Sequence, residues 1–310
     1  MNAPAAADAR TRSWNAAMSA SPGSLDLDVP AAAIEGRIPS VLQGGRLLSN
    51  GPGWTRIGDV TAHPFDGHGY VRSFEFASDG GVQLRARFVR TPSYVAEEAT
   101  GRFVRRGLAT NVPGGPFRNL TLGPPRNVAN TTILRFGDRL LAGWEGGAPF
   151  ALDPVTLDTH GEETFGGAIA GQATLAHFHR GPGDGTLVSC SIVSFPKPVL
   201  TFREFDASGA LVRPRTARPP APLFLHDFSV TPNWYVVGGN PIRLQPGRLV
   251  KMLAGFGTLL ESIEPEPARA PVLYLVPRHA DGPVRTVRLP GPAFVVHFAN
   301  AFERDGAVHV

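Results

Sequence analysis

The chain has 310 residues and a formal net charge of +4, and 42% of its residues are hydrophobic. That length is enough to bury a large core in one big domain or in two ordinary ones. The positive charge comes from arginine, because Lys197 and Lys251 are the only lysines. The densest basic run, residues 102–106, has no aromatic platform or nucleic-acid motif beside it, so the composition argues against a nucleic-acid partner.

The N-terminal residues are rich in Ala, Ser and Asp and lack a basic start followed by an apolar run. We therefore predict a flexible lead over residues 1–37 rather than a signal peptide. Cys190 is the single cysteine, so no intramolecular disulfide is expected. No apolar stretch approaches the roughly 20 residues of a membrane span. These features predict a soluble, cytoplasmic protein with a folded domain over residues 38–310.

Short apolar segments rich in Val, Leu, Phe and Thr follow the lead, separated by turn signals such as Ser78-Asp79-Gly80 and Asp305-Gly306. The 36 glycines and 30 prolines are spread along the chain rather than clustered. This pattern predicts an all-β fold, which is a sandwich, a barrel or a propeller. The predicted strands cover residues 82–89, 130–136, 139–144, 187–193, 199–205, 228–237, 272–276, 284–289 and 294–299.

One helix is predicted, over residues 247–260, where Leu249, Leu253, Phe256 and Leu260 fall on one face. The favoured interpretation is a helix that packs this face against the core. The alternative is an exposed apolar patch that contacts a membrane surface to collect an apolar substrate.

Three of the nine histidines, His177, His226 and His297, have apolar or aromatic neighbours, so each imidazole is expected to be at least partly buried. A buried imidazole needs a partner for its nitrogens, and a metal ion is one such partner. For any one of them alone, a hydrogen-bonded core histidine is the ordinary interpretation. Together, three buried histidines on separate strand-like segments converge only if the fold points its strands at a common axis, as a propeller does.

Six short motifs, in chain order, resemble those of the carotenoid cleavage oxygenases, a family that includes enzymes cleaving carotenoids, apocarotenoids and stilbenes. The resemblance runs from about Ile38 to the last residue. Each motif is weak alone, but six in the family's order with compatible spacings make chance a poor explanation. The motifs are Asn50-Gly51-Pro52-Gly53, His63-Pro64-Phe65-Asp66-Gly67, Asn130-Thr131, Trp144-Glu145-Gly146-Gly147, Leu225-His226-Asp227-Phe228 and His297-Phe298-Ala299-Asn300-Ala301-Phe302-Glu303.

This resemblance implies a seven-bladed β-propeller whose axis holds one Fe(2+) ion bound by four histidines, with glutamates outside them. Three of these ligands carry over onto His177, His226 and His297. Glu145 lies in the segment that supplies one such glutamate, and His226 is its expected partner. A carboxylate that accepts the far N–H of a ligand imidazole fixes the tautomer and orientation of that ring. Apart from the metal ligands, no catalytic residue is predicted.

The resemblance places the family's fourth histidine in a region beyond Val310, and His309 is not expected to replace it. At roughly 40 to 60 residues a blade, this length covers about five of the seven blades. We therefore expect an incomplete propeller, truncated at the C-terminus, with an exposed strand edge. Two other departures, His68 in place of an acidic residue and Ser49 in place of an arginine, fall outside the ligand positions.

Two other metal folds compete with this interpretation. Gly171, His177, His179 and Asp184 imitate the first metal motif of a cupin, but residues 291–300 lack the Pro-x-Gly of its second motif. A triad of two histidines and a carboxylate is disfavoured, because Asp227 directly follows His226 and would point to the opposite side of a strand. The family resemblance selects His177 over His179, which is expected at the surface or beside a ligand.

The implied activity is cleavage of a carbon–carbon double bond of a carotenoid or apocarotenoid by dioxygen, giving two carbonyl products. One alternative is a stilbene-cleaving enzyme, although the tyrosine of such members aligns with Phe88 and no lysine precedes Lys197. The other is an inactive propeller fragment with a binding or scaffold role, which metal content would distinguish from an enzyme. The candidates for lining an apolar tunnel are Phe65, Phe228, Trp234 and Phe298.

Overall fold

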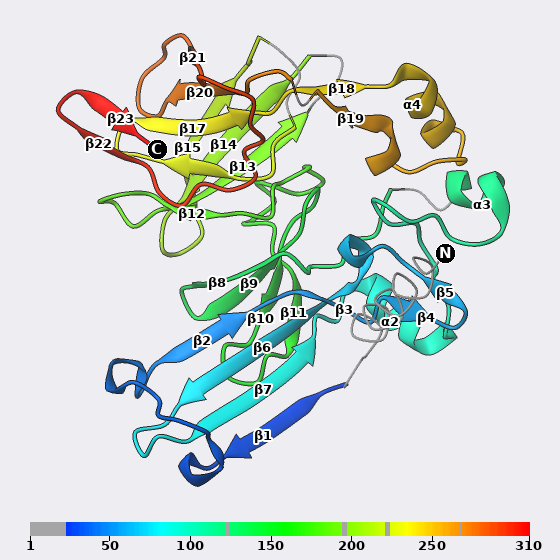
Figure 1. The fold of residues 1–310 in the computed structure, drawn as a ribbon, viewed down its shortest axis with the longest axis vertical. Helices are drawn as coiled ribbons and strands as arrows, with labels where there is room; N and C mark the ends of the chain where they lie inside the picture. Colours follow the sequence, from blue (N-terminus) through cyan, green and yellow to red (C-terminus); the bar gives the residue numbers. More distant parts are fainter. Residues whose placement is uncertain (1–22, 122–123, 194–196, 221–223, 267) are drawn as a thin grey trace, which may run out of the picture. The chain divides into compact units, whose positions relative to one another are not determined.

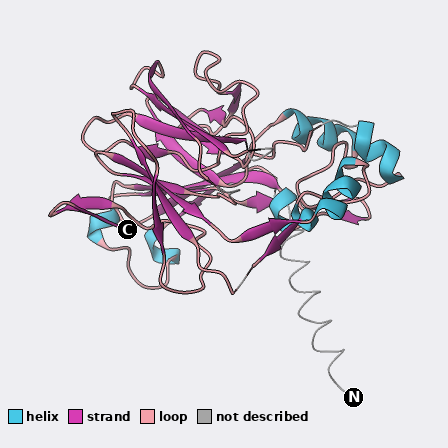
Figure 2. Cartoon of the chain, turned by 90° about the horizontal axis from the view of Figure 1, so that it is seen from above, coloured by secondary structure: helices cyan, strands magenta, loops and turns pink. Residues whose placement is uncertain are grey.

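The computed structural model describes residues 23–121, 124–193, 197–220, 224–266 and 268–310. Strands predominate in this part of the chain and the helices are short (Figure 2). Contacts divide the chain into two compact units, described separately below. Unit 1 comprises Met1–Ala142, Phe150–Gly161 and Leu253–Thr258, and unit 2 comprises Gly143–Pro149, Glu162–Met252 and Leu259–Val310.

The first sheet of unit 1 is antiparallel and is built around a long hairpin of two strands, β6 and β7 (cyan in Figure 1). Buried residues alternate with partly buried ones along most of β6 and at the end of β7, as in a sheet with one face on the core. The strand order is β1 (Leu25–Val29), β7 (Val82–Phe88), β6 (His68–Phe76) and β2 (Arg46–Ser49), with β3 (Pro52–Gly53) also paired to β6.

The predicted lead over residues 1–37 is wrong for its last part. Residues 1–22 lie outside the described residues, but Leu25–Val29 forms strand β1, paired along its whole length with β7. Asp26 also forms ion pairs with Arg85 at 2.8 Å and with Arg87 at 2.6 Å. The alternation of Leu or Val with Asp over residues 25–29 is a strand pattern, and Asp26 faces arginines of the neighbouring strand.

A second sheet in unit 1 is a four-stranded meander. Its apolar residues Leu140 and Leu152 pack with Val71 and Val89 of the first sheet in one buried core. The meander order is β11 (Thr159–Glu162), β10 (Phe150–Leu152), β9 (Arg139–Gly143) and β8 (Thr132–Phe136).

The helix α2 (Pro92–Thr100) begins after Thr91, whose hydroxyl accepts from the Tyr94 amide, and it ends at Gly101 with φ 62°. The small elements are η1 (Ala31–Ala33), η2 (Ser40–Leu42), β4 (Arg56–Ile57), β5 (Val60–Thr61), η3 (Pro64–Asp66) and α3 (Gly115–Thr121).

Unit 1 also holds a fully buried polar network. The Nε2 atom of His68 lies 2.7 Å from Glu97, and neither side chain is exposed. Arg126 donates to Glu97 at 3.1 Å, and the Val104 amide donates to the same carboxylate at 3.0 Å. Rings of aromatic residues surround His68, with the Trp54 ring centre 5.5 Å away. Because Glu97 contacts both His68 and Arg126, the buried charges of this network compensate one another, and we interpret the network as structural.

Unit 2 contains two four-stranded antiparallel sheets that share a core. The rings of Phe202 and Tyr235, one from each sheet, stack at 4.1 Å and 2°. Cys190 on the strand Leu187–Val193 is fully buried in the same core. One sheet has the order β12 (His179–Arg180), β13 (Leu187–Val193), β14 (Val199–Phe205) and β15 (Leu211–Ala217), and the other β16 (Phe228–Val230), β17 (Trp234–Gly239), β20 (Val272–Pro277) and β21 (Arg285–Arg288).

Smaller elements complete unit 2. The hairpin of β22 and β23 turns at Asp305 and Gly306, which both have positive φ (52° and 74°), as the predicted Asp-Gly turn requires. The remaining elements are β18 (Ile242–Leu244), α4 (Pro246–Leu253), η4 (Leu260–Ser262), β19 (Ile263–Pro265), β22 (Phe302–Arg304) and β23 (Ala307–His309).

Three predicted elements are corrected by the structure. The strand predicted over 228–237 is a hairpin of β16 and β17, because Pro232 in the intervening turn has no N–H to continue a ladder. Residues 294–299 form no strand, since the Val295 amide donates to the Asn240 side chain and the Phe298 amide to the Asp227 side chain. The helix predicted over 247–260 ends at Leu253, and none of its residues is buried, so the prediction that it faces the core is wrong.

Candidate metal centre

The three predicted ligands, His177, His226 and His297, come together in unit 2. Each offers one ring nitrogen to a cluster in which all three ligand atoms lie within 4.8 Å of one another. None of the three is on a regular strand, contrary to the prediction. His177 lies in the loop before β12, His226 in the loop before β16, and His297 in the irregular segment before β22.

Hydrogen bonds to neighbouring strands hold these loops in place. The Leu175 amide donates to the Cys190 carbonyl at 2.8 Å, which ties the segment before His177 to β13. Asn240, at the end of β17, donates to the carbonyls of Phe224 at 3.2 Å and Val295 at 2.7 Å. The segments that lead to His226 and His297 are thereby joined through one buried amide.

The imidazoles face one another with nearly perpendicular rings. The Nε2 atoms of His177 and His226 are 3.2 Å apart. The three ring-centre separations are 4.8, 4.9 and 4.8 Å, with interplanar angles of 79°, 76° and 71°. Two nitrogens bound at about 2.1 Å to one ion at right or tetrahedral angles are roughly 3.0–3.4 Å apart, so the observed separation fits a shared metal ion.

Glu145 contacts His226 as predicted. The Nδ1–H of His226 donates to Glu145 Oε1 over 2.8 Å, and this leaves the Nε2 lone pair for the cluster. The Ala176 amide donates to the same oxygen at 3.4 Å, so the carboxylate is also tied to the segment that carries His177. The carboxylate therefore favours the His226 tautomer that keeps the Nε2 lone pair free.

Burial and neighbouring charges set the protonation of the cluster. Burial lowers the pKa of His177 to about 4, which keeps this imidazole neutral at neutral pH. Burial opposes protonation of His226, but its hydrogen bond to Glu145 and the Glu145 charge outweigh that effect and raise its pKa. A neutral imidazole is the form that binds metals.

His297 differs from the other two ligands in its exposure. Its side chain is 56% exposed, compared with 21% for His226, so the expectation that all three would be partly buried is wrong for this residue. Its Nδ1 atom lies 3.5 Å from Asp227 Oδ2. His309 lies apart from this cluster, with its ring stacked on Phe302 at 4.9 Å.

Asp227 is the site residue that the sequence analysis missed. Its carboxylate accepts from His179 Nε2–H at 2.8 Å, from the Phe228 amide at 2.8 Å and from the Phe298 amide at 3.1 Å. Burial would raise the pKa of Asp227, but the bonds from His179 and Phe298 outweigh it and lower the pKa to about 2. His179 therefore lies beside the ligands, as expected, with one nitrogen bonded to Asp227.

Of the predicted tunnel residues, Phe65 is 62% exposed and Phe228 belongs to the core. Phe298 packs beside a small buried cluster.

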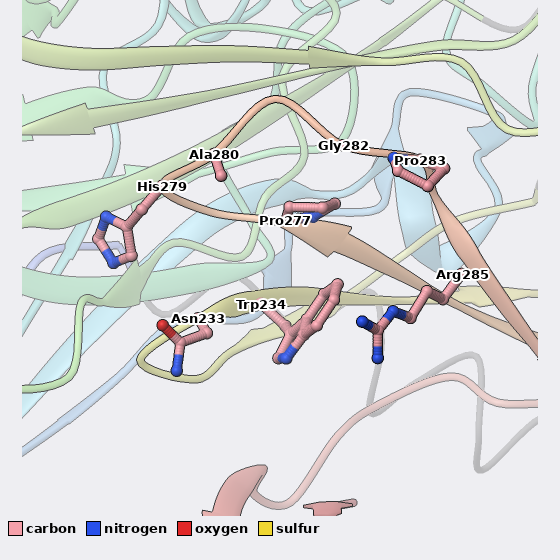
Figure 3. A pocket seen from close by; sticks show the side chains of 8 residues that line it. All are labelled: Asn233, Trp234, Pro277, His279, Ala280, Gly282, Pro283 and Arg285. Carbon is pink, nitrogen blue, oxygen red and sulfur yellow. The ribbon is translucent and has the colours of Figure 1, made fainter. Parts of the chain in front are cut away.

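Trp234 lines a separate pocket of about 300 Å³ in unit 2, where the Arg285 guanidinium lies 4.6 Å from its ring centre (Figure 3). This pocket offers no converging set of metal ligands, so the histidine cluster is the candidate site. The pocket is lined by Asn233, Trp234, Pro277, His279, Ala280, Gly282, Pro283 and Arg285.

Comparisons with known proteins agree with the motif resemblance. A family model described as retinal pigment epithelial membrane protein matches residues 21–310. The apocarotenoid-15,15'-oxygenase of Synechocystis sp. is 40% identical over an alignment of 285 residues, which covers 89% of this chain and 57% of that protein. Carotenoid cleavage dioxygenase 7 of Oryza sativa subsp. japonica is 33% identical over 333 residues, covering 89% of this chain and 54% of that protein. The chain thus spans about half the length of these curated relatives.

The solved structure of cobalt-substituted Synechocystis apocarotenoid oxygenase (ACO) matches with a TM-score of 0.85 and 36% identity, covering 96% of this chain and 62% of that one. This match confirms the predicted fold class, an all-β chain that forms an incomplete part of a seven-bladed propeller. The match of the family model begins before Ile38, in agreement with the paired strand β1. The chain therefore belongs to the retinal pigment epithelial membrane protein family, which is the carotenoid cleavage oxygenase family that its motifs resemble.

Proposed function

We propose that the protein is a metal-dependent oxygenase that uses dioxygen to split a carbon–carbon double bond of a carotenoid or apocarotenoid into two carbonyl products. The convergence of three imidazoles, with Glu145 bonded to one of them, carries this proposal. The names of the two curated relatives support it, since both describe oxygenases acting on carotenoids or apocarotenoids.

Fe(2+) is the proposed metal ion, and His177, His226 and His297 would hold it. Imidazole nitrogens suit iron among the first-row metals. The bound ion would supply the activation of dioxygen for attack on an electron-rich double bond. The chain itself keeps His177 neutral by burial and holds the His226 ring through Glu145, so that two lone pairs point at one place.

An apolar polyene is the proposed substrate, rather than a phenolic stilbene. The position expected to carry a phenol grip is Phe88, whose buried ring stacks on Tyr94 at 5.2 Å. An apolar ring offers no hydrogen bond to a phenol. Metal content tests the metal proposal, and it also tests the alternative that the chain is an inactive fragment with a binding or scaffold role.

Metal content of the purified 310-residue chain is the first test, followed by loss of polyene absorbance together with dioxygen uptake. Since the chain supplies three of the four histidine ligands that the resemblance implies, we expect weak binding of at most one iron per chain, and loss of that iron in His177→Gln, His226→Gln and His297→Gln variants. His279→Gln is the matched control, because this histidine of unit 2 donates to the Pro232 carbonyl and is outside the cluster. A wild-type chain that binds no iron, or a control that loses iron as the three variants do, contradicts the proposal.

We also propose a cytoplasmic protein that contacts a membrane surface through residues 247–260. In the part of the chain that the structure describes, no helix has the length and apolar character to cross a bilayer. Within residues 247–260, three apolar side chains are more than half exposed: Val250 at 64%, Leu253 at 60% and Phe256 at 69%. Apolar side chains of this kind bind the interface of a bilayer.

Sedimentation with phosphatidylcholine vesicles tests this contact. The double variant Val250→Glu with Leu253→Glu should bind about tenfold or more weakly, since each apolar side chain contributes about 1.5–3 kcal/mol when buried. Val155→Glu is the control, because Val155 is 62% exposed and lies outside this segment. Equal vesicle binding by wild type and the double variant would contradict membrane contact through this segment.

A further inference from the structure

Each of the three histidines lies on a separate segment of unit 2, and one carboxylate contacts all three segments. Asp227 directly follows His226 in the chain. It accepts from the ring of His179, two residues after His177, and from the Phe298 amide, the residue after His297. A single side chain therefore belongs to one of the three segments and bonds to the other two.

Asp227 is held more tightly than a surface carboxylate. It is 4% exposed, and each of its oxygens has a donor: Oδ1 accepts from His179 and the Phe228 amide, and Oδ2 accepts from the Phe298 amide. A buried carboxylate without such donors would be strongly unfavourable, so the donors and the carboxylate fix one another.

The same carboxylate selects a tautomer of His297. Its Oδ2 lies 3.5 Å from His297 Nδ1, which is longer than a normal hydrogen bond and acts as a charge contact. An anion at this position favours the proton on Nδ1, which leaves the Nε2 lone pair for a metal ion. Asp227 thus affects both the position and the tautomer of the most exposed of the three imidazoles.

We propose that Asp227 is a positioning residue of the metal centre, which fixes the mutual geometry of the segments carrying His177, His226 and His297, with His179 as its partner. This inference rests on the proposed metal-binding function. The role differs from that of Glu145, which contacts the His226 ring and the Ala176 amide, because Asp227 links the segment of His226 to the segments of both His177 and His297.

Cobalt(II) is the probe for the test, because its d–d absorption reports coordination number and geometry as well as affinity. Asp227→Asn keeps the shape of the side chain but replaces one acceptor oxygen by an N–H2 group, which faces the donor of His179 or of Phe298. We expect about 10- to 100-fold weaker cobalt binding and an altered d–d spectrum.

Glu303→Gln is the matched control. Glu303 is another carboxylate of unit 2 with several donors, the Thr231 hydroxyl at 2.6 Å and the amide and side chain of Asn233 at 2.8 Å each. None of these donors belongs to the three histidine segments. This control should lose stability without a change in the cobalt spectrum. If Asp227→Asn leaves cobalt affinity and spectrum unchanged, or changes them no more than Glu303→Gln does, the inference is overturned.

A second pair of variants keeps the test decisive if Asp227→Asn does not fold. His179→Gln retains an N–H donor for Asp227, whereas His179→Phe removes it. We expect His179→Phe to weaken cobalt binding and alter the spectrum, and His179→Gln to restore both towards wild type. Equal behaviour of the two variants would contradict the inference.

Failure of the proposed function can be distinguished from failure of this inference. A wild-type chain that binds neither cobalt nor iron refutes the metal site. The positioning role is then judged on the metal-free chain by nuclear magnetic resonance of the histidine rings. Asp227→Asn should shift the ring signals of His177, His226 and His297, and Glu303→Gln should not. Unshifted signals in Asp227→Asn would refute the positioning role.

Discussion

Two histidine–glutamate pairs of this chain have almost the same N···O distance but differ in their burial and in their neighbouring residues. In unit 1 the His68–Glu97 pair is 2.7 Å long, and both side chains are fully buried. In unit 2 the His226–Glu145 pair is 2.8 Å long, and its side chains are 21% and 25% exposed. Arg126 neutralises the first carboxylate, whereas the ring of the second pair faces two further imidazoles.

The comparison shows that a histidine–glutamate contact alone does not identify a metal ligand. What differs is where the second ring nitrogen points. For His226 it faces His177 across 3.2 Å. For His68 the neighbouring rings are Trp54 and Tyr94, neither of which is an imidazole, and its Nδ1 has no hydrogen-bond partner among the described residues. We therefore expect the first pair to contribute to stability and the second to metal binding.

The largest effect is expected from Glu97→Ala. This change leaves Arg126 and His68 buried without their shared partner, so the free energy of unfolding should fall by about 3–5 kcal/mol. Urea denaturation measures this loss. Cobalt affinity of the folded variant should stay at the wild-type value, because Glu97 bonds to His68, Arg126 and the Val104 amide. Weaker cobalt binding in the folded variant would mean that the two pairs are not functionally separate.

The opposite pattern is expected from Glu145→Gln. The amide can still contact His226, but it no longer favours the required tautomer, and metal affinity should fall about 10- to 100-fold. The free energy of unfolding should change by less than about 1 kcal/mol, since the pair is partly solvated. Cobalt titration and urea denaturation of the same sample check both statements. Unchanged metal affinity would remove Glu145 from the site.

A smaller, pH-dependent effect should come from the unit 1 pair. Burial lowers the pKa of His68 below 6.5. Burial would raise the pKa of Glu97, but the His68 bond and the Arg126 charge lower it below 4.5. Both groups bind protons more readily when unfolded, so their stabilisation is present near neutral pH and is lost as the pH falls, first below 6.5 and then below 4.5.

Urea denaturation between neutral and acidic pH measures this loss. Glu97→Gln should flatten the acid part of the curve, because the variant has no carboxylate to protonate there. A variant curve parallel to that of wild type would show that other groups cause the acid sensitivity.

The smallest effect is expected from Asp26→Asn. The Asp26 side chain is 57% exposed, and its ion pairs with Arg85 and Arg87 are solvated, so the free energy of unfolding should fall only slightly. The loss should shrink at high salt. A loss as large as that of Glu97→Ala would show that strand β1 stabilises the unit far more than its exposed pairs suggest.

The sequence predicted the site better than it predicted the local backbone. The motifs identified three histidines and Glu145, and these side chains converge. Asp227 was missed because a regular strand, in which neighbouring residues point to opposite sides, was expected at this position. Asp227 instead lies in the loop before β16, where its carboxylate can reach His179 and Phe298.

The wrong backbone predictions share a physical cause, which is the contribution of distant partners. Residues 294–299 have the composition of a strand, but the side chains of Asn240 and Asp227 take two of their amides. The amphipathic pattern of α4 is real, but periodicity does not say what covers its apolar face. Patterns of neighbouring residues were sufficient for most of the strands that were predicted, such as Leu187–Val193 and Val199–Phe205.

The position of Cys190 gives the protein an internal reporter of its own opening. The side chain is fully buried in the core of unit 2, and burial raises the pKa of its thiol, so a thiol reagent cannot reach a reactive thiolate in the closed state. Since the chain has one cysteine, any labelling comes from this position. The labelling rate therefore measures how often strand β13 transiently separates from its neighbours, without any engineered probe.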